Sequence, residues 1–395
     1  MEKGIELVRP GQAEVKADLN ALFRGAIRMV LEYLLNEEVS QLIGAERYQR
    51  IASRTDYRNG SYLRRLATAL GWIELEVPRP RTGPVPQGVL ERYQRREESV
   101  NTLVREAYVG GCSTRDLERL TEALLGEGLS RSTMSRITEE LTEEVESYFR
   151  RPLAKAYPYL FLDATFLDAR WAGAVENVSA LVAYGVDEEG HRELLGLRLG
   201  CEESEESWSE LLGELAERGL QGVRLVIRDE HAGLRRAIRR FLPRAEQQRC
   251  WIHFLRNVTA RVPLRLRKQV VAELKPIWNA GSGEDAQRRA EAWLEKWEGE
   301  LPEAAKILRA GLEASLTFYR YPKGHRKRIR STNALERLHA EIQRRIGAVG
   351  AFPDRKSALK LVGICALRVA HKWSDRRYLD MKSEAQTRKE EAKAA

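Results

Sequence analysis

Three carboxylates stand where their side chains could bind divalent cations. Asp163 interrupts the apolar segment 159–166, and Asp229 comes two residues after the end of the apolar segment 223–227. Glu336 lies in a third segment, of helical periodicity. Phosphodiester chemistry without a covalent intermediate uses two cations about 4 Å apart, which steady the attacking and the leaving oxygen. Since Mg²⁺ usually takes only one or two carboxylates per ion, three carboxylates on separate elements suit such a pair.

Each carboxylate also has a purely structural interpretation. Asp163 could end a strand with hydrogen bonds to the backbone, and Asp229 could cap the helix that follows it. Asn333 could be the N-cap of a helix in which Glu336, three residues later, completes a capping box. Asp168 is a second acidic residue near the same strand and a rival to Asp163.

In the segments around these residues, the spacing of apolar residues alternates between that of a strand and that of a helix. We predict strands at 159–166, 178–186 and 192–199, then a helix at 207–218, a strand at 223–227, a helix at 234–241 and a strand at 247–251. Residues 187–190 have the composition of a turn between two of the strands. This order predicts an α/β fold with a mixed sheet and helices packed against it. Adjacent strands lie about 4.8 Å apart, so carboxylates on two of them can share an ion.

After residue 257 the pattern becomes helical. Residues 258–325 show no strand pattern and contain three tryptophans, which predicts an all-helical insertion. The basic run 323–330 follows, and then a helix that begins near Asn333. Its apolar stripe consists of Leu335, Leu338, Ile342 and Ile346, and a further helix is expected at 359–373.

The N-terminal part combines helices with one hairpin. A helix is predicted at 15–45, and strands 62–68 and 72–77 can pair around Gly71, with a proline-rich linker after them. That linker contains Pro78, Pro80, Pro84 and Pro86. Residues 113–149 read as two helices separated at Gly126 and Gly128, with Ser130 capping the second. This pattern fits a helix-turn-helix that reads DNA, and equally any helical hairpin.

Four ordered motifs closely resemble segments of the Mutator-like insertion-sequence transposases of bacteria. They are residues 163–165, 228–234, 249–257 and 331–338, and the N-terminal segments 57–60, 75–79 and 111–116 fit as well. The resemblance covers nearly the whole chain. It implies a ribonuclease-H-like core interrupted by the helical insertion, and an Asp-Asp-Glu triad of Asp163, Asp229 and Glu336 with Mg²⁺ or Mn²⁺ as cofactor. Glu230 departs from the family pattern, in which a small residue is expected.

Four further residues are expected to support the triad. Cys250 and His253 form a Cys-x-x-His pair, and the resemblance assigns them to a motif beside the site. Half of a zinc site is the alternative, although no second pair lies at finger spacing. His231 could orient Asp229 or a phosphate, or be purely structural, and Asn333 is the fourth expected support residue.

Basic residues near Glu336 predict a nucleic-acid surface. The net charge is +9 with a pI near 9.4, which favours polyanionic partners. Seven side chains would carry positive charge beside the cations, and a solvated helix face is the alternative. They are Arg326, Lys327, Arg328, Arg330, Arg337, Arg344 and Arg345.

Composition restricts the compartment. No apolar run reaches the roughly 18 residues that span a bilayer, and the first residues lack the apolar middle of a secretory signal. The four cysteines are too scattered for a disulfide framework. Together with the family resemblance, these observations lead us to expect a bacterial cytoplasmic protein that associates with the nucleoid when bound to DNA.

These interpretations divide the chain into six segments. We expect an N-terminal helix, hairpin and linker at 1–97, a helix-turn-helix-like DNA-binding segment at 98–152, and core segments at 153–257 and 326–380. The insertion at 258–325 separates the two core segments, and a disordered tail occupies 381–395. The expected function is DNA end cleavage and strand transfer by a homodimer acting on terminal inverted repeats and target DNA. A nuclease that only hydrolyses, and a DNA-binding protein with a non-catalytic core, are the alternatives.

Overall fold

The structure is a computed structural model that describes residues 12–83, 87–91, 94–171, 174–200, 202–349, 351–374 and 376–381. These residues form two compact units, one ending at Glu140 and the other beginning at Leu141. Within the described ranges, no helix is long and apolar enough to cross a membrane. The expected tail after residue 381 and the prolines at 84 and 86 lie outside the described residues.

The first unit joins a long helix to a two-stranded sheet and shorter helices. Its elements are α1 (Gln12–Ile43), β1 (Arg58–Thr68), β2 (Gly71–Pro80), α2 (Glu98–Gly110), α3 (Thr114–Leu125) and the start of α4 (Arg131–Arg150). The predicted hairpin is confirmed, with Ile73, Leu75 and Val77 buried on one face against α1. β2 nevertheless runs through Pro78 and Pro80, so the prediction that they end it was wrong. A two-stranded sheet has only edge strands, which tolerate proline.

The helical pair after the hairpin forms as predicted. Gly126 ends α3 in a left-handed conformation (φ 79°), and the Ser130 hydroxyl accepts a hydrogen bond from the Thr133 amide at the start of α4. Ser113 and Asp116 form a capping box at the start of α3. The preceding helix α2 was not predicted from the sequence.

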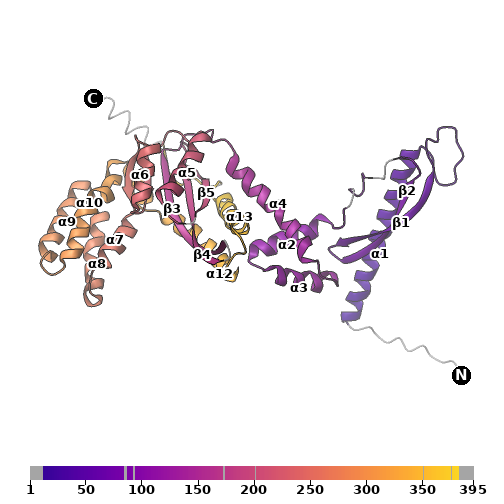
Figure 1. Ribbon diagram of the computed structural model, residues 1–395, viewed down its shortest axis with the longest axis horizontal. Helices are drawn as coiled ribbons and strands as arrows, with labels where there is room; N and C mark the ends of the chain where they lie inside the picture. The colour runs from indigo at the N-terminus through magenta and orange to yellow at the C-terminus, as the bar shows by residue number, and fades with distance from the viewer. Residues whose placement is uncertain are drawn as a thin grey trace, which may run out of the picture. The chain divides into compact units, whose positions relative to one another are not determined.

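The second unit is built on a five-stranded mixed sheet (Figure 1). Its elements up to the last strand are β3 (Tyr159–Trp171), β4 (Ala174–Val186), β5 (Arg192–Gly200), α5 (Glu205–Glu217), β6 (Leu225–Arg228), α6 (Ala232–Phe241) and β7 (Glu246–Arg249). The strand order is β5-β4-β3-β6-β7, with β3, β4 and β5 antiparallel in turn and β3, β6 and β7 parallel. The predicted order of strands and helices is confirmed.

The remaining elements are all helical. They are α7 (Trp251–Thr259), α8 (Leu264–Trp278), α9 (Gly283–Trp297), α10 (Pro302–Leu316), the 3₁₀ turn Thr317–Arg320, α11 (Lys323–Ile329), α12 (Asn333–Val349) and α13 (Arg355–Ser374). Helices α8, α9 and α10 lie together away from the sheet (Figure 1), which agrees with the predicted insertion. Two details differ: Trp251 begins a helix instead of ending a strand, and the basic run is largely the helix α11.

Opposite faces of the sheet carry different helices. Leu160 and Leu162 of β3 belong to an apolar core with α5 and α6. Because side chains alternate along a strand, Tyr159, Phe161 and Asp163 share the other face. There the ring of Tyr159 contacts His325 of α11, and Phe161 stacks on Tyr184, which contacts Trp373 of α13. Asp163 therefore faces the helices of the C-terminal part.

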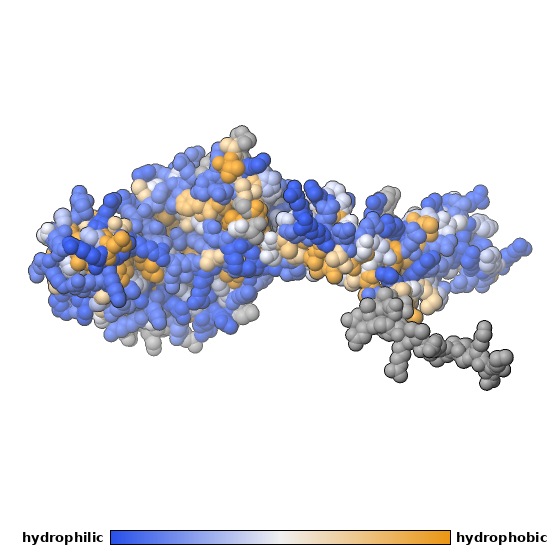
Figure 2. Space-filling view, turned by 90° about the horizontal axis from the view of Figure 1, so that it is seen from below, coloured by the Kyte–Doolittle hydropathy of each residue, from blue (hydrophilic) through white to orange (hydrophobic). Residues whose placement is uncertain are grey.

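The surface is mainly hydrophilic on the face drawn in Figure 2, with scattered apolar patches. Helix α1 has large apolar side chains exposed although its other side packs on the hairpin. Leu22 and Met29 are each 67% exposed and Tyr33 is 63% exposed. This helix face has no covering in the described part of the chain.

Candidate active site

Asp163 and Asp229 lie on neighbouring parallel strands. The last paired residues of β3 and β6 are Phe161 and Ile227, and each aspartate comes two residues later on its own chain segment. Both side chains therefore extend toward the same side at the carboxyl end of the strand pair. Asp163 is only 7% exposed, whereas Asp229 is partly exposed. Ligands of such sheets gather at these strand ends.

A histidine, His253, lies between Glu336 and Asp229. The Nδ1 atom of His253 lies 3.4 Å from Asp229 Oδ2, and its Nε2 atom lies 4.0 Å from Glu336 Oε1. His339, one turn after Glu336 on α12, places its Nδ1 atom 3.8 Å from Asp163 Oδ2. The three candidate carboxylates thus converge around two imidazoles.

Helix α12 is held against the sheet at its start and in its middle. The Thr332 amide and hydroxyl both lie 3.5 Å from Cys250 Sγ, directly before α7. Gln343 donates hydrogen bonds to the Thr165 hydroxyl and the Phe166 carbonyl of β3. The apolar stripe predicted for this helix is fully buried. These contacts fix Glu336 relative to Asp163.

The helix begins one residue earlier than a capping box at Glu336 requires. Asn333 is the first residue of α12, and Thr332 accepts the amides of Leu335 and Glu336 with its backbone carbonyl. The carboxylate of Glu336 instead lies 3.3 Å from Arg256 NH2. Glu336 is therefore free of the capping role that the sequence left open.

Burial shifts the pKa values of ionisable groups in the site. Burial raises the pKa of Asp163 to about 7, with His253 opposing the shift and Asp229 adding to it. Its interaction with Cys250 raises the pKa of His253 above the ordinary value, burial opposes this, and the two aspartates reinforce it. Burial, assisted by His253, lowers the pKa of His339 to about 4. His253 Nδ1 is buried without a hydrogen-bond partner.

The other expected support residues have different environments. His231 caps α6, because its Nδ1 accepts the Leu234 amide at 3.2 Å. Glu230 forms ion pairs with Arg228, Arg235 and Arg249, so the extra carboxylate that departs from the family pattern does not join Asp229. Asn333 is exposed and lines a basic cavity described below.

The seven expected DNA-binding residues fall into two groups. Lys327, Arg328 and Arg337 are exposed and form no ion pair among the described residues. The other four are engaged by their own chain: Arg326 bonds the carbonyls of Tyr319 and Tyr321, Arg330 bonds that of Trp278, and Arg344 and Arg345 pair with Glu341. These contacts within the chain compete with DNA binding by the four side chains.

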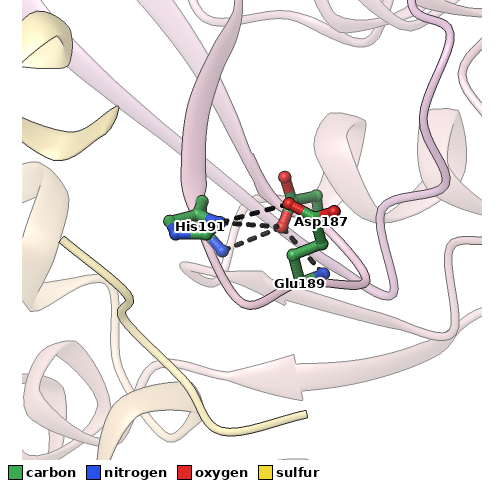
Figure 3. A group of neighbouring side chains, drawn as sticks. All are labelled: Asp187, Glu189 and His191. Atoms are coloured by element: carbon green, nitrogen blue, oxygen red, sulfur yellow. Dashed lines mark hydrogen bonds and ion pairs between the residues drawn. The ribbon is translucent and has the colours of Figure 1, made fainter. Parts of the chain in front are cut away.

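A second acidic cluster lies in the turn between β4 and β5. Ligand atoms of Asp187, Glu189 and His191 lie within 4.8 Å of one another (Figure 3). The oxygens of Asp187 are already used, however, since they accept the amides of Glu189 and His191 and the ammonium of Lys155. These bonds give the cluster a structural role, which is to stabilise the turn between β4 and β5. The atoms of Asp163, Asp229 and Glu336 do not all lie this close together.

Sequence reasoning missed three residues of the site. Thr332 lies in one of the motifs and contacts both Cys250 and Asp163. His339 could have been found from helical spacing, because it is three residues after Glu336 and shares its side of the helix. Arg256 carried no signal beyond its place in a motif.

Comparisons with known proteins identify the family of the chain. The sequence matches the family described as "Transposase, Mutator family" over residues 2–376. It is 38% identical to the transposase for insertion sequence element ISRM5 of Rhizobium meliloti (strain 1021), over 91% of this chain and 90% of that protein. It is 35% identical to the transposase for IS406 of Burkholderia multivorans, over 88% and 90% of the two chains. It is 34% identical to the transposase for IS256 in transposon Tn4001 of Staphylococcus aureus, over 93% and 94%. The chain belongs to the Mutator family of transposases.

Proposed function

We propose that this transposase cleaves the ends of an insertion sequence and joins them to target DNA, with Asp163, Asp229 and Glu336 as its reactive carboxylates. The observation that carries the proposal is the convergence of these three side chains from β3, β6 and α12 around His253. The strand order β5-β4-β3-β6-β7, with three antiparallel and two further parallel strands, supports a ribonuclease-H-like core. The names of the relatives support insertion-sequence ends as the substrate.

The residues fit a pair of divalent cations. A buried carboxylate with a raised pKa, beside a second carboxylate, is unfavourable unless positive charge is supplied. The donor set is oxygen-rich, which suits Mg²⁺ or Mn²⁺ better than Zn²⁺. Asp163 and Asp229 would share one ion, and Glu336 would hold the second. In such sites divalent cations supply Lewis-acid activation of the attacking and leaving oxygens.

The chain's own groups position these carboxylates. His253 lies between Asp229 and Glu336 and would set their separation, while Thr332 contacts Asp163. In the first step, water attacks the phosphodiester at the element end, and the 3′ oxygen leaves with a proton. In the second, that 3′ hydroxyl attacks a target phosphodiester in line, and the target strand is broken as the new bond forms. No bond to the protein is needed in either step.

We assign recognition of the terminal repeats to the first unit. Arg136 is exposed near the start of α4, where a helix-turn-helix presents its reading side chains. Arg131 is also exposed there, and its Nε lies 3.4 Å from Glu118 Oε2. The hairpin adds a cavity of about 730 Å³ whose lining includes Arg64, Arg79 and Arg95. A helical hairpin without DNA contact is the alternative, and the exposed arginines favour the reader.

We also propose a homodimer, because two element ends must be brought together. On α1 the residues Leu19, Leu22, Ala26, Met29 and Tyr33 are all exposed and recur at alternating spacings of three and four. This is the repeat by which two helices pack as a coiled coil. Leu22→Glu should weaken the dimer in sedimentation experiments. A variant that stays fully dimeric would exclude this face.

A strand-transfer assay tests the function. Wild-type protein, Asp229→Asn and the control Asp168→Asn are given labelled element-end DNA, target DNA and Mg²⁺ or Mn²⁺. Asp168 lies in the same strand as Asp163 but is exposed and bonds Asn177, so Asp168→Asn should stay active. Asp229→Asn should lose both cleavage and joining. Cleavage without joined products would favour the nuclease, and no cleavage by wild type would favour the non-catalytic alternative.

A further inference from the structure

A basic cavity in the second unit carries more positive charge than its surroundings neutralise. It has a volume of about 380 Å³ and is lined by segments of β5, α7, α11, α12 and the chain after α13. Its lining contains no acidic residue from the described part of the chain. Arg330 lines it but is bonded to the Trp278 carbonyl. The remaining cationic side chains are Arg192, Lys327, Arg328, Arg337, Arg376 and Arg377.

None of these six forms an ion pair with any residue the structure describes. Other arginines of the unit are paired, as Arg344 and Arg345 are with Glu341. Arg192 is the most constrained of the six: its guanidinium lies 4.5 Å from the ring centres of Trp373 and Tyr378, and its Nε is buried without a hydrogen-bond partner. Burial and repulsion from Arg328 and Arg337 lower its pKa, against the effect of two tyrosines.

Clustered like charges repel, and an anion with several charges relieves the repulsion. A single small anion could contact only a few of these six side chains, which come from four segments of the chain. A chain of phosphates meets them at successive positions, since guanidinium and ammonium groups both bind phosphate oxygens. The number and spread of the cations thus favour a phosphodiester backbone.

The cavity also adjoins the carboxylates. Trp251, two residues before His253, and Arg337, directly after Glu336, both line it. Helices α7 and α12 therefore contribute side chains to the catalytic centre and to the cavity. A strand whose scissile phosphate lies at the carboxylates can continue along these helices into the cavity.

We propose that this cavity binds the sugar-phosphate backbone of the DNA strand next to the scissile phosphate. The inference rests on the proposed function and adds a subsite to it. It replaces part of the surface expected from the sequence, because it takes in Arg192, Arg376 and Arg377 and leaves out Arg344 and Arg345. In this subsite Lys327 and Arg337 bind phosphates directly, since both are exposed and free of ion pairs.

The test pairs protein substitutions with neutral phosphates. Element-end duplexes carry one methylphosphonate at each position around the cleavage point, and binding to full-length protein is followed by fluorescence anisotropy in chelator. For wild type, a neutral linkage at a contacted phosphate should weaken binding about 3- to 10-fold. In Arg337→Ala or Lys327→Ala that penalty should vanish at the phosphate which the missing side chain contacted. Thermal melts confirm that the variants fold.

Arg309→Ala is the matched control. It also removes one positive charge, but Arg309 is exposed on α10 and paired with Glu298, so every penalty should persist. Penalties that are identical in wild type and in both cavity variants would overturn the subsite. The subsite would also be overturned if the cavity variants bound DNA as wild type does and lost only the inhibition of that binding by inorganic pyrophosphate. This result would indicate a site for a small anion. Cleavage by wild type is measured separately with Mg²⁺. If wild type cleaves but the penalty of a neutral phosphate does not depend on Lys327 or Arg337, the subsite alone is refuted.

Discussion

Replacing Asp163 by asparagine should stabilise the metal-free protein while abolishing its activity. Burial raises the pKa of this carboxyl group from 3.8 to about 7. In the unfolded chain the group ionises near pH 4, so between pH 4 and 7 only the folded state retains the proton. Stability therefore falls as the pH rises through this window. Three pKa units correspond to about 4 kcal/mol, which is the upper limit of the penalty above pH 7.

Asparagine removes the ionisation but keeps an oxygen for the Ala164 amide, which now bonds Asp163 Oδ1. It also loses the attraction to His253, so we expect a net gain of about 1–3 kcal/mol at pH 8 and little at pH 4. Urea unfolding at both pH values, in chelator, measures the difference. Tryptophan fluorescence suits the second unit, because seven of the eight tryptophans lie after residue 140.

Added Mg²⁺ supplies the second arm of this experiment. It should stabilise the wild type at pH 8 more than the asparagine variant, since a ligand that binds only the folded state raises stability by mass action. A variant that is no more stable than wild type at pH 8 would refute the electrostatic reasoning. A variant stabilised equally at pH 4 and pH 8 would show that packing, and not charge, causes the gain.

Three further results are expected. Glu336→Gln should lower strand transfer about 10²-fold or more with an unchanged melting temperature, because the cation-binding charge is lost, whereas Glu341→Gln should remain active. Gly190→Ala should lower the free energy of unfolding by roughly 2–4 kcal/mol, since φ is 87° and a Cβ would lie 1.9 Å from the Leu379 carbonyl oxygen; urea unfolding measures it. A fragment ending at Glu140 should bind terminal-repeat DNA with sequence preference in mobility-shift assays, and preference retained only by the remainder would contradict the assignment of recognition.

The sequence predicted those parts of the fold that follow from local periodicity. A continuous apolar segment located β3, which is buried on both faces. The stripe from Leu335 to Ile346 located the buried side of α12, because burial on one face of a helix leaves a repeat in the sequence. The extent of β2 was not predictable in this way. Whether Pro78 can lie within a strand depends on whether its nitrogen, which has no hydrogen to donate, faces the partner strand. Only the pairing with Ser61 decides this.

The sequence proposes the residue types of the candidate site, but the contacts between these residues could not be predicted from it. The motif around residue 250 located His253, yet nothing local indicates that its two nitrogens lie near carboxylates 24 residues before it and 83 residues after it. The role of Glu336 was ambiguous because the helix could begin at either of two adjacent residues. The start at Asn333, beside the contact between Thr332 and Cys250, excludes the capping box, and the catalytic role of Glu336 stays a proposal. The basic cavity could not be predicted from local sequence either, because its cationic side chains come from segments up to 185 residues apart.

Groups of opposite charge meet at α12, which contributes Glu336 to the carboxylates and Arg337 to the cations of the cavity. The carboxylates converge on one side of α12, and the cationic side chains line a cavity on another. A cation at the carboxylates would strengthen the attraction of the scissile phosphate, and a strand held in the cavity would place that phosphate beside the cation. Binding of metal and of DNA should therefore be coupled, and thermodynamic linkage requires each to raise the affinity for the other by the same factor. On this argument, the buried charge of Asp163 costs stability in the free protein so that cation and DNA are bound most tightly when both are present.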